Sequence, residues 1–287
     1  MAEAGFTGPL LEAALKPFQV LEALSLPAQY ERSFKIEPGL LITQRFMLGV
    51  RTEWAAGERL IEAARLLGMP ASVRPAFAQA LSDASTVLFG FEGSEPDEGA
   101  GESHTSAIFK VYTEHRSRLA NRSANDPPVE LFRGFKWQAD RPDHCAQTVY
   151  WCRPGFATEA IHTQVGEHLA APALAPVREL VATVIERAGR ARPGFTPQWI
   201  ELGEVGQPIR AFDLNLYDAG LRVAALAAPL TGLADSYRVN GAMLSRLLSV
   251  AGSGLLGHVS AGMSRRGDGF LTVYFEPAEQ VPSGVRG

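Results

Sequence analysis

The sequence has few of the residues that mark metal centres, disulfide frameworks or nucleic-acid binding. Its two cysteines, Cys145 and Cys152, are seven residues apart and have no histidine cluster near them, so neither a zinc site nor a disulfide framework is indicated. Its 27 Lys and Arg residues are outnumbered by 31 Asp and Glu, and a formal net charge of -4 argues against broad contact with phosphate backbones. We therefore expect a reducing compartment and no nucleic-acid partner.

Long apolar runs are also missing. The longest, from Val223 to Ala234, is too short to cross a bilayer, is rich in alanine and contains Pro229. The opening residues Met-Ala-Glu-Ala-Gly lack the basic segment and the apolar stretch of a secretory signal. These absences predict a cytoplasmic protein without a membrane span.

The residues that are present fit a globular protein, because 46% of the 287 are hydrophobic and 20% are charged. This length is enough for one large domain or two small ones. The six histidines have no metal-ligand spacing, and we expect each of them, His258 included, to be an ordinary surface or core residue.

Apolar residues with helical spacing recur along the chain. Four stretches, 10–24, 54–67, 177–188 and 244–251, place them on one helical face, and Asn240 is a suitable N-cap for the last. We predict that these four stretches are amphipathic helices, each with one face on a core.

Between the helices lie five pairs of strand-like runs, at about 30–37 with 40–48, 85–92 with 105–114, 130–138 with 145–152, 198–205 with 209–217, and 256–264 with 269–276. Short connections make each pair an antiparallel hairpin, because parallel neighbours need a crossover of roughly a dozen residues. Helices against the apolar strand faces would leave the polar faces to enclose a ligand. We predict a single α/β domain over residues 1–287, a ten-stranded antiparallel β-barrel surrounded by helices.

Four of the six tyrosines share one position in these strands. Tyr112, Tyr150, Tyr217 and Tyr274 each follow a Val or Leu, and the residues two before them are the polar Lys110, Thr148, Asn215 and Thr272. Because side chains alternate across a strand, each Tyr shares a face with its polar partner. A single tyrosine in a strand is usually structural, but the fourfold repeat predicts polar faces that converge on the barrel interior.

This helix-then-hairpin order, with a Lys-x-Tyr strand followed by three more strands ending in Tyr, resembles the aromatic prenyltransferases of the ααββ (ABBA) barrel type. The stretch from Tyr30 to Phe46, YERSFKIEPGLLITQRF, is similar to the first hairpin of the cyanobactin-type peptide prenyltransferases. The resemblance implies transfer of a dimethylallyl or longer prenyl group from its diphosphate to an electron-rich side chain of a peptide natural product.

Prenyl transfer has three chemical requirements, and each has a candidate. Arg45, Lys110 and the tyrosine hydroxyls can bind the diphosphate through charge-assisted hydrogen bonds. The rings of Tyr112, Tyr150, Tyr217 and Tyr274 can shield the allylic cation by cation–π attraction of about 0.5–2 kcal/mol each. The acceptor must lose a proton to a base. The resemblance implies that Glu31, by its place in the first-strand motif, is that base.

No Asp-rich motif of the DDxxD kind occurs, so the three-magnesium site of the all-helical isoprenoid enzymes is not indicated. We predict no metal site on the protein. Mg²⁺ bound through the substrate diphosphate is compatible with this sequence.

Additional candidates on the polar strand faces are Asp213, Asn215, Thr272 and Glu276. Asp213 and Glu276 suit a base or a metal ligand, and equally a charge at the barrel rim. Thr148, Asn215 and Thr272 stand where many ABBA enzymes repeat the lysine, which leaves few cations for a diphosphate. Two alternatives therefore stay open: a small-molecule phenol or indole prenyltransferase of the same fold, and a non-catalytic barrel that binds an apolar or aromatic ligand.

Overall fold

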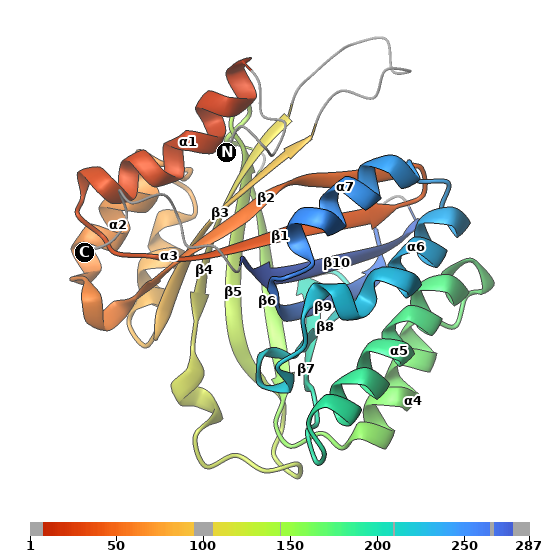
Figure 1. The fold of residues 1–287 in the computed structure, drawn as a ribbon. Coiled ribbons are helices and arrows are strands. Elements are labelled where there is room, and N and C mark those ends of the chain that lie inside the picture. The colour runs from red at the N-terminus through yellow and green to blue at the C-terminus, as the bar shows by residue number, and fades with distance from the viewer. Residues whose placement is uncertain (1–7, 95–105, 144, 209, 265–266, 278–287) are drawn as a thin grey trace.

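In a computed structural model the chain forms a closed barrel of ten antiparallel strands with helices around it (Figure 1). The structure describes residues 8–94, 106–143, 145–208, 210–264 and 267–277. Each strand pairs with its neighbours in sequence, and β1 pairs with β10 to close the sheet. The fold class predicted from the sequence is confirmed.

The strands lie within two residues of their predicted positions at most ends. They are β1 (Gln29–Glu37), β2 (Leu40–Arg51), β3 (Thr86–Ser94), β4 (Ser106–Glu114), β5 (Val129–Gln138), β6 (Cys145–Arg153), β7 (Gln198–Glu204), β8 (Ala211–Asn215), β9 (Leu255–Met263) and β10 (Gly269–Glu276). Residues 105 and 209, where two of the expected strands begin, lie outside the described residues.

Among the α-helices of the described chain, one precedes the first hairpin and the others come in pairs between hairpins. They are α1 (Gly8–Ala23), α2 (Gly57–Leu66), α3 (Arg74–Leu81), α4 (Thr158–His168), α5 (Ala175–Ala191), α6 (Ala227–Ser236) and α7 (Gly241–Ala251). Between β4 and β5, where the repeat would place helices, the described chain has a 3-10 helix, Arg116–Leu119.

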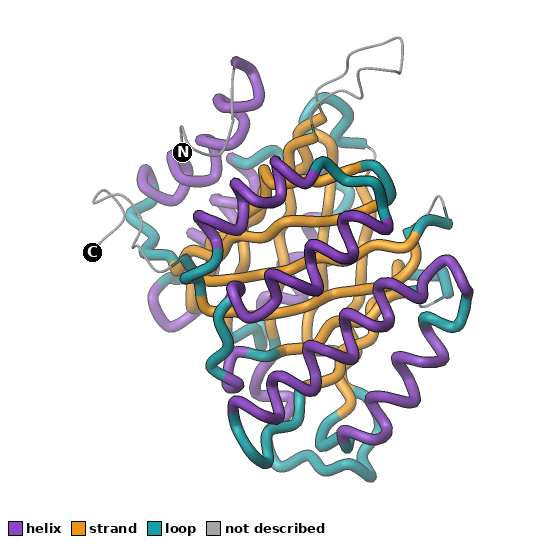
Figure 2. The backbone as a smooth tube through the Cα atoms, turned by 45° about the vertical axis from the view of Figure 1, so that its right-hand side comes forward, coloured by secondary structure: helices purple, strands orange, loops and turns teal. Residues whose placement is uncertain are grey.

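The outer face of the sheet is covered in two parts, seen as the red-orange and the green-blue helices in Figure 1. The first part packs α1, α2 and α3 on β2 to β5, where Leu21, Leu60 and Phe77 meet Phe89 and Val111. The second packs α4 to α7 on β1 and β7 to β10. Figure 2 shows these helices crossing the strands of the barrel. Burial of this outer apolar face turns the alternate residues of each strand inward.

Local sequence explains the predicted helices that the structure confirms. The side chain of Asn240 accepts hydrogen bonds from the backbone N–H groups of Ala242 and Met243, at 3.0 and 3.2 Å, so it caps α7 as expected. The periodic apolar residues of 177–188 form the buried face of α5.

Two predicted boundaries are wrong. The helix expected over 54–67 begins at Gly57, after a 3-10 helix at Thr52–Trp54. The strand expected to reach residue 217 ends at Asn215, because the side chain of Asn215 accepts a hydrogen bond from the Tyr217 N–H at 3.3 Å and Tyr217 begins a 3-10 helix. Such local bonds compete with strand pairing. Tyr217 therefore has a different backbone setting from the other three tyrosines.

Helices α3, α4 and α6 were not predicted. They are short, and α4 buries only Ile161 and Val165 from its eleven residues, so its apolar periodicity is weak. Tertiary packing rather than local pattern decides such helices. Among the described residues, no helix has both the length and the apolar character needed to cross a membrane.

Helix α6 provides a test of the outer core. Leu230 is fully buried in it, whereas Met243 in α7 is 44% exposed. We expect Leu230→Ala to lower the free energy of unfolding by about 2–5 kcal/mol, because it leaves a cavity between helix and sheet. The matched change Met243→Ala should alter it by about 0.5 kcal/mol or less. Urea unfolding measures both, and equal effects would contradict this packing.

Candidate functional site

A cavity of about 620 Å³ lies inside the barrel. Its lining includes ten of the eleven residues singled out from the sequence: Glu31, Arg45, Lys110, Tyr112, Tyr150, Asp213, Asn215, Tyr217, Tyr274 and Glu276. Thr272 is buried two residues from Tyr274 in β10 but does not line this cavity. Residues far apart in the sequence therefore share one chamber.

The mouth of the cavity lies at the end of the barrel where odd-numbered strands begin and even-numbered strands finish. Gln29 and Thr86 open β1 and β3 there, and Glu276 ends β10. Arg116 and Asp218, both exposed, also belong to the lining and mark the solvent side. A ligand can enter from this end.

Glycines on neighbouring strands leave room for the inward tyrosines. Gly134 pairs with Tyr112 across β4 and β5, and a Cβ atom at Gly134 would lie 2.5 Å from a carbon of the tyrosine ring. A Cβ atom at Gly257 would come equally close to the ring of Tyr217. Both separations are far below van der Waals contact, so side chains at these positions would displace the rings.

The two predicted cations share one carboxylate. Glu92, in β3, forms an ion pair with the Lys110 ammonium and lies 3.5 Å from Nη2 of Arg45. Burial alone would raise the pKa of the Glu92 carboxyl, but Arg45 and Lys110 outweigh burial and hold that pKa below its usual range. Burial lowers the pKa of Lys110, against the opposing charge of Glu92. This cluster carries one net positive charge when all three groups are ionised.

Arg45 keeps an unused donor. Its side chain is 8% exposed, and within the described chain its buried Nε has no hydrogen-bond partner. A buried unpaired donor costs about 1–3 kcal/mol, so a polar ligand that reaches it would be stabilised. An anion is the natural complement of this group.

Three tyrosines form an aromatic wall with Phe132. The rings of Tyr112 and Tyr150 meet edge to face with centroids 5.8 Å apart, and Phe132 meets Tyr150 at the same distance. Tyr274 continues the wall beside His258, at 6.1 Å. Burial raises the pKa values of Tyr150 and Tyr274 well above the usual value, so both phenols stay neutral. Neutral rings present electron-rich faces to the cavity.

Glu31 and Tyr217 come together near the mouth of the cavity, where β1 begins and β8 ends. The Tyr217 hydroxyl donates a hydrogen bond to the Glu31 carboxylate across 186 residues of sequence. Burial raises the pKa of Glu31, while His258 and the Tyr217 hydroxyl oppose that rise. Glu31 lies within β1, as the strand expected over 30–37 implies, and pairs with Met47.

His258 and Glu92 are two site residues that sequence reasoning missed. His258 was expected to be an ordinary histidine, but it lines the cavity and its Nδ1 lies 2.5 Å from Oδ1 of Asp213. Glu92 lies beside the two cations although it was given no role. Strand alternation contained the signal, because His258 alternates with the apolar Val259, and Glu92 with Phe91.

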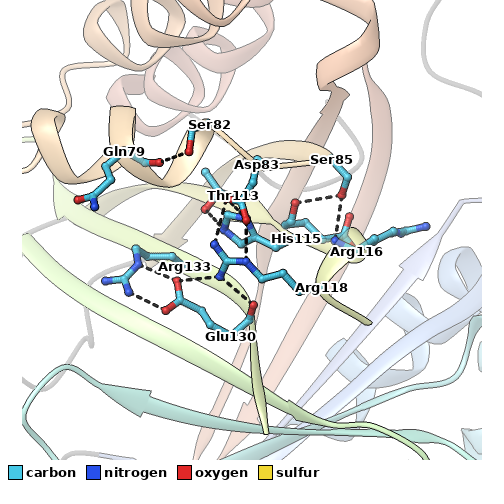
Figure 3. Close-up of polar contacts among 12 residues, drawn as sticks. Gln79, Ser82, Asp83, Ser85, Thr113, His115, Arg116, Arg118, Glu130 and Arg133 are labelled. Atoms are coloured by element: carbon cyan, nitrogen blue, oxygen red, sulfur yellow. Dashed lines mark hydrogen bonds and ion pairs between the residues drawn. The ribbon is translucent and has the colours of Figure 1, made fainter. Parts of the chain in front are cut away.

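A polar network holds the rim near Arg116. Arg118 donates two hydrogen bonds to the Asp83 carboxylate, at 2.7 and 3.0 Å, and His115 Nδ1 lies 3.0 Å from the same carboxylate (Figure 3). Arg118 also donates to the backbone oxygen of Glu130 at 3.1 Å. These contacts tie the 3-10 helix Arg116–Leu119 to β5 and to the end of α3. The rim is therefore fixed where Leu119 faces the cavity.

Among the described residues, no group of three or more His, Cys, Asp or Glu side chains is arranged to hold a metal ion. Cys145 and Cys152 are both free thiols, and burial raises the pKa of Cys152 to about 12.

No family model matches the sequence, and no curated protein matches it either. Solved structures do match in fold. The 5-dimethylallyltryptophan synthase from Streptomyces coelicolor has a TM-score of 0.58 and 15% identity, over 96% of this chain and 93% of that one. The prenyltransferase PriB has a TM-score of 0.56 and 16% identity, over 98% of this chain and 96% of that one. NotF, in complex with brevianamide F and DMSPP, has a TM-score of 0.50 and 12% identity, over 88% of this chain and 81% of that one.

These likenesses agree with the barrel described above. A closed barrel of ten antiparallel strands inside a layer of helices is the ABBA prenyltransferase barrel, and this chain has that fold. At 15 and 16% identity the likeness is one of fold. The resemblance to cyanobactin-type enzymes in the first hairpin stays a prediction.

The shared carboxylate yields a stability test. Glu92→Gln leaves Arg45 and Lys110 buried without the carboxylate that they share, and we expect the free energy of unfolding to fall by about 3–5 kcal/mol. Glu92→Gln/Lys110→Met removes one of the two cations and should recover part of that loss. Urea unfolding compares the variants with the wild-type protein. A double variant less stable than Glu92→Gln would refute the assigned pairing.

Proposed function

We propose that this protein is a prenyltransferase that moves a dimethylallyl or longer prenyl group from its diphosphate to an electron-rich aromatic acceptor. The observation that carries this proposal is a single cavity lined by two buried cations, five tyrosines and the partly buried carboxylate of Glu31. The fold shared with solved prenyltransferases supports it.

Arg45 and Lys110 are the proposed donor site. Both line the cavity beside Tyr112 and Tyr274, and the unpaired Nε of Arg45 suits a phosphate oxygen. When the donor ionises, its carbon–oxygen bond breaks and the electron pair leaves with the diphosphate. The cations stabilise this developing negative charge. Mg²⁺ would enter on the diphosphate, as part of the donor.

The tyrosine wall is the proposed shield for the allylic cation. Rings at 5.8 Å from one another enclose the space next to the cations, and their neutral faces attract positive charge. Leu131 and Ile200, on the same side of the cavity, are apolar and exclude water that would trap the cation. This apolar part of the lining is the proposed place of the donor's prenyl chain.

Glu31 is the proposed base. The acceptor's aromatic electrons form the new bond to the allylic carbon, and the proton released from the acceptor passes to the Glu31 carboxylate. Its position in the cavity and its hydrogen bond from Tyr217 support this role. The carboxylate must be ionised to act.

For the acceptor we propose an aromatic side chain of a peptide, on the strength of the first-hairpin resemblance. An open mouth with exposed Arg116 and Asp218 is compatible with a peptide that extends outside the barrel. A small phenol or indole is the alternative within the same chemistry. A solved structure of the 5-dimethylallyltryptophan synthase holds DMASPP and Trp.

One observation favours a second candidate, a non-catalytic barrel that binds an apolar or aromatic ligand. Glu92 already neutralises one of the two cations, so a diphosphate meets a weaker positive field than separate cations would give. In such a barrel, ligand would bind without ionisation of a donor.

Substitutions test the assigned roles. We expect Arg45→Ala and Lys110→Ala each to lower donor turnover by about 10- to 100-fold, since each removes a charge-assisted contact worth about 1.5–3 kcal/mol. Glu31→Gln should bind the donor normally but slow the transfer, because an amide cannot accept the proton. Diphosphate release and donor affinity are the measurements. Arg190→Ala, at an exposed residue on α5, is the control, and unchanged turnover in the other three variants would refute the site.

The activity itself is tested by mass spectrometry. The protein is incubated with magnesium, with dimethylallyl, geranyl and farnesyl diphosphates, and with short linear and cyclic peptides plus free Tyr and Trp. We expect one or more prenyl masses on a peptide; transfer to a free amino acid alone would favour the small-molecule alternative. Repeating the reaction with a chelator tests the proposed use of magnesium. Neither transfer nor diphosphate release would favour the ligand-binding barrel.

A further inference from the structure

His258 is a cavity residue to which the proposed reaction gives no role. It lies in the middle of β9, its side chain is 16% exposed, and its Nδ1 contacts Oδ1 of Asp213 in β8 at 2.5 Å. Within the described chain, Nδ1 is the ring nitrogen that has a hydrogen-bond partner. A buried charged carboxylate beside an imidazole favours the protonated ring.

Several titratable groups surround this imidazole. The Tyr217 ring lies 5.4 Å from it, edge to face, and the Tyr274 ring lies 6.1 Å away. The carboxylates that act on its charge are Asp213 from β8, Glu31 from β1 and Glu114 from β4. Glu31 in turn faces Asp213 from β8 and Glu276 from β10. His258 is thus the positively charged group that acts most strongly on the Glu31 carboxyl, in a part of the cavity that is otherwise acidic.

We propose that Asp213 and His258 form a positioning pair that keeps Glu31 ionised, so that Glu31 can accept the proton of the acceptor near neutral pH. This inference rests on the proposed function. The physical reason is the sign of the neighbouring charges. Glu31 is partly buried, and Asp213 and Glu276 are negative, so the loss of solvent and both charges oppose ionisation of Glu31. The imidazolium of His258 and the hydroxyl of Tyr217 are the groups that favour it.

Asp213 keeps the His258 ring protonated. Burial alone would lower the pKa of His258, but Asp213, Glu31 and Glu114 together raise it above the usual value. The ring is therefore charged at neutral pH and has no free lone pair with which to act as the base itself. His258 acts through Glu31, and Asp213 acts through His258.

The pH dependence of transfer distinguishes this role from a purely structural one. A carboxylate whose pKa is raised loses its base function as the pH falls through that pKa. His258→Gln removes the positive neighbour, so the acidic limb of the kcat profile should move up by about one pH unit or more. At pH values below the limb, kcat of His258→Gln should be about tenfold lower than kcat of the wild-type protein, and at alkaline pH the two should be equal. Loss of activity at every pH, or an unmoved limb, would overturn the proposal.

Two further variants change the charges around Glu31 in different ways, so the acidic limb should shift by different amounts in each. Asp213→Asn lowers the pKa of His258 but also removes a negative neighbour of Glu31, so we expect a smaller shift of the acidic limb than in His258→Gln. His258→Gln/Asp213→Asn removes one charge of each sign and should move the limb back toward the wild-type position. His162→Gln, on the exposed face of α4, serves as the control with an unchanged profile. A double variant with a larger shift than His258→Gln would contradict the pairing.

A measurement without turnover separates this inference from the proposed function. Nitrogen-15 NMR of the histidine rings, titrated from about pH 5 to about pH 10, reports the protonation of His258 directly. We expect a protonated ring through neutral pH in the wild-type protein, and titration at lower pH in Asp213→Asn and in Glu31→Gln. A neutral ring at pH 7 would overturn the pair even if the enzyme were active. Absence of prenyl transfer with a protonated ring would refute the proposed function and leave the charged pair in place.

Discussion

Closure of the sheet by the pairing of β1 with β10 is the constraint on which the rest of this structure depends. In a closed barrel every second side chain points into one interior, and the polar atoms there have few partners except each other and a ligand. Helices pack on the outer face of the same strands and fix which residues turn inward. The alternation of side chains along each strand therefore produces both the outer core and the site.

The interior charges are arranged by this constraint into separate clusters. Arg45 and Lys110 share Glu92, while His258 pairs with Asp213. Each cluster lowers the cost of burying its charges, because each contains both signs. The two clusters also give the cavity two chemically different parts, one suited to an anion and one that can hold a carboxylate ready for a proton.

The proposed reaction uses both parts and the aromatic wall between them. A diphosphate bound at the cationic cluster would ionise next to neutral tyrosine rings, and an acceptor entering from the mouth would meet Glu31 near the beginning of β1. Glycines such as Gly134 are as necessary as the tyrosines, since a larger residue would displace the Tyr112 ring. In the proposed reaction the barrel therefore contributes mainly the space of the cavity and the placement of its charged groups, rather than one reactive residue.

The sequence by itself determined what depends on nearby residues. Alternation in 105–114 and 269–276 was enough to put Lys110, Tyr112 and Tyr274 on inward faces, and the spacing in 177–188 was enough for α5. Tertiary structure alone decided which inward residues meet: Glu92 with two cations, His258 with Asp213, and Tyr217 with Glu31 across 186 residues of sequence. The physical reason is that strand periodicity is a local property, whereas contacts across a barrel depend on register, bulges and closure of the whole sheet.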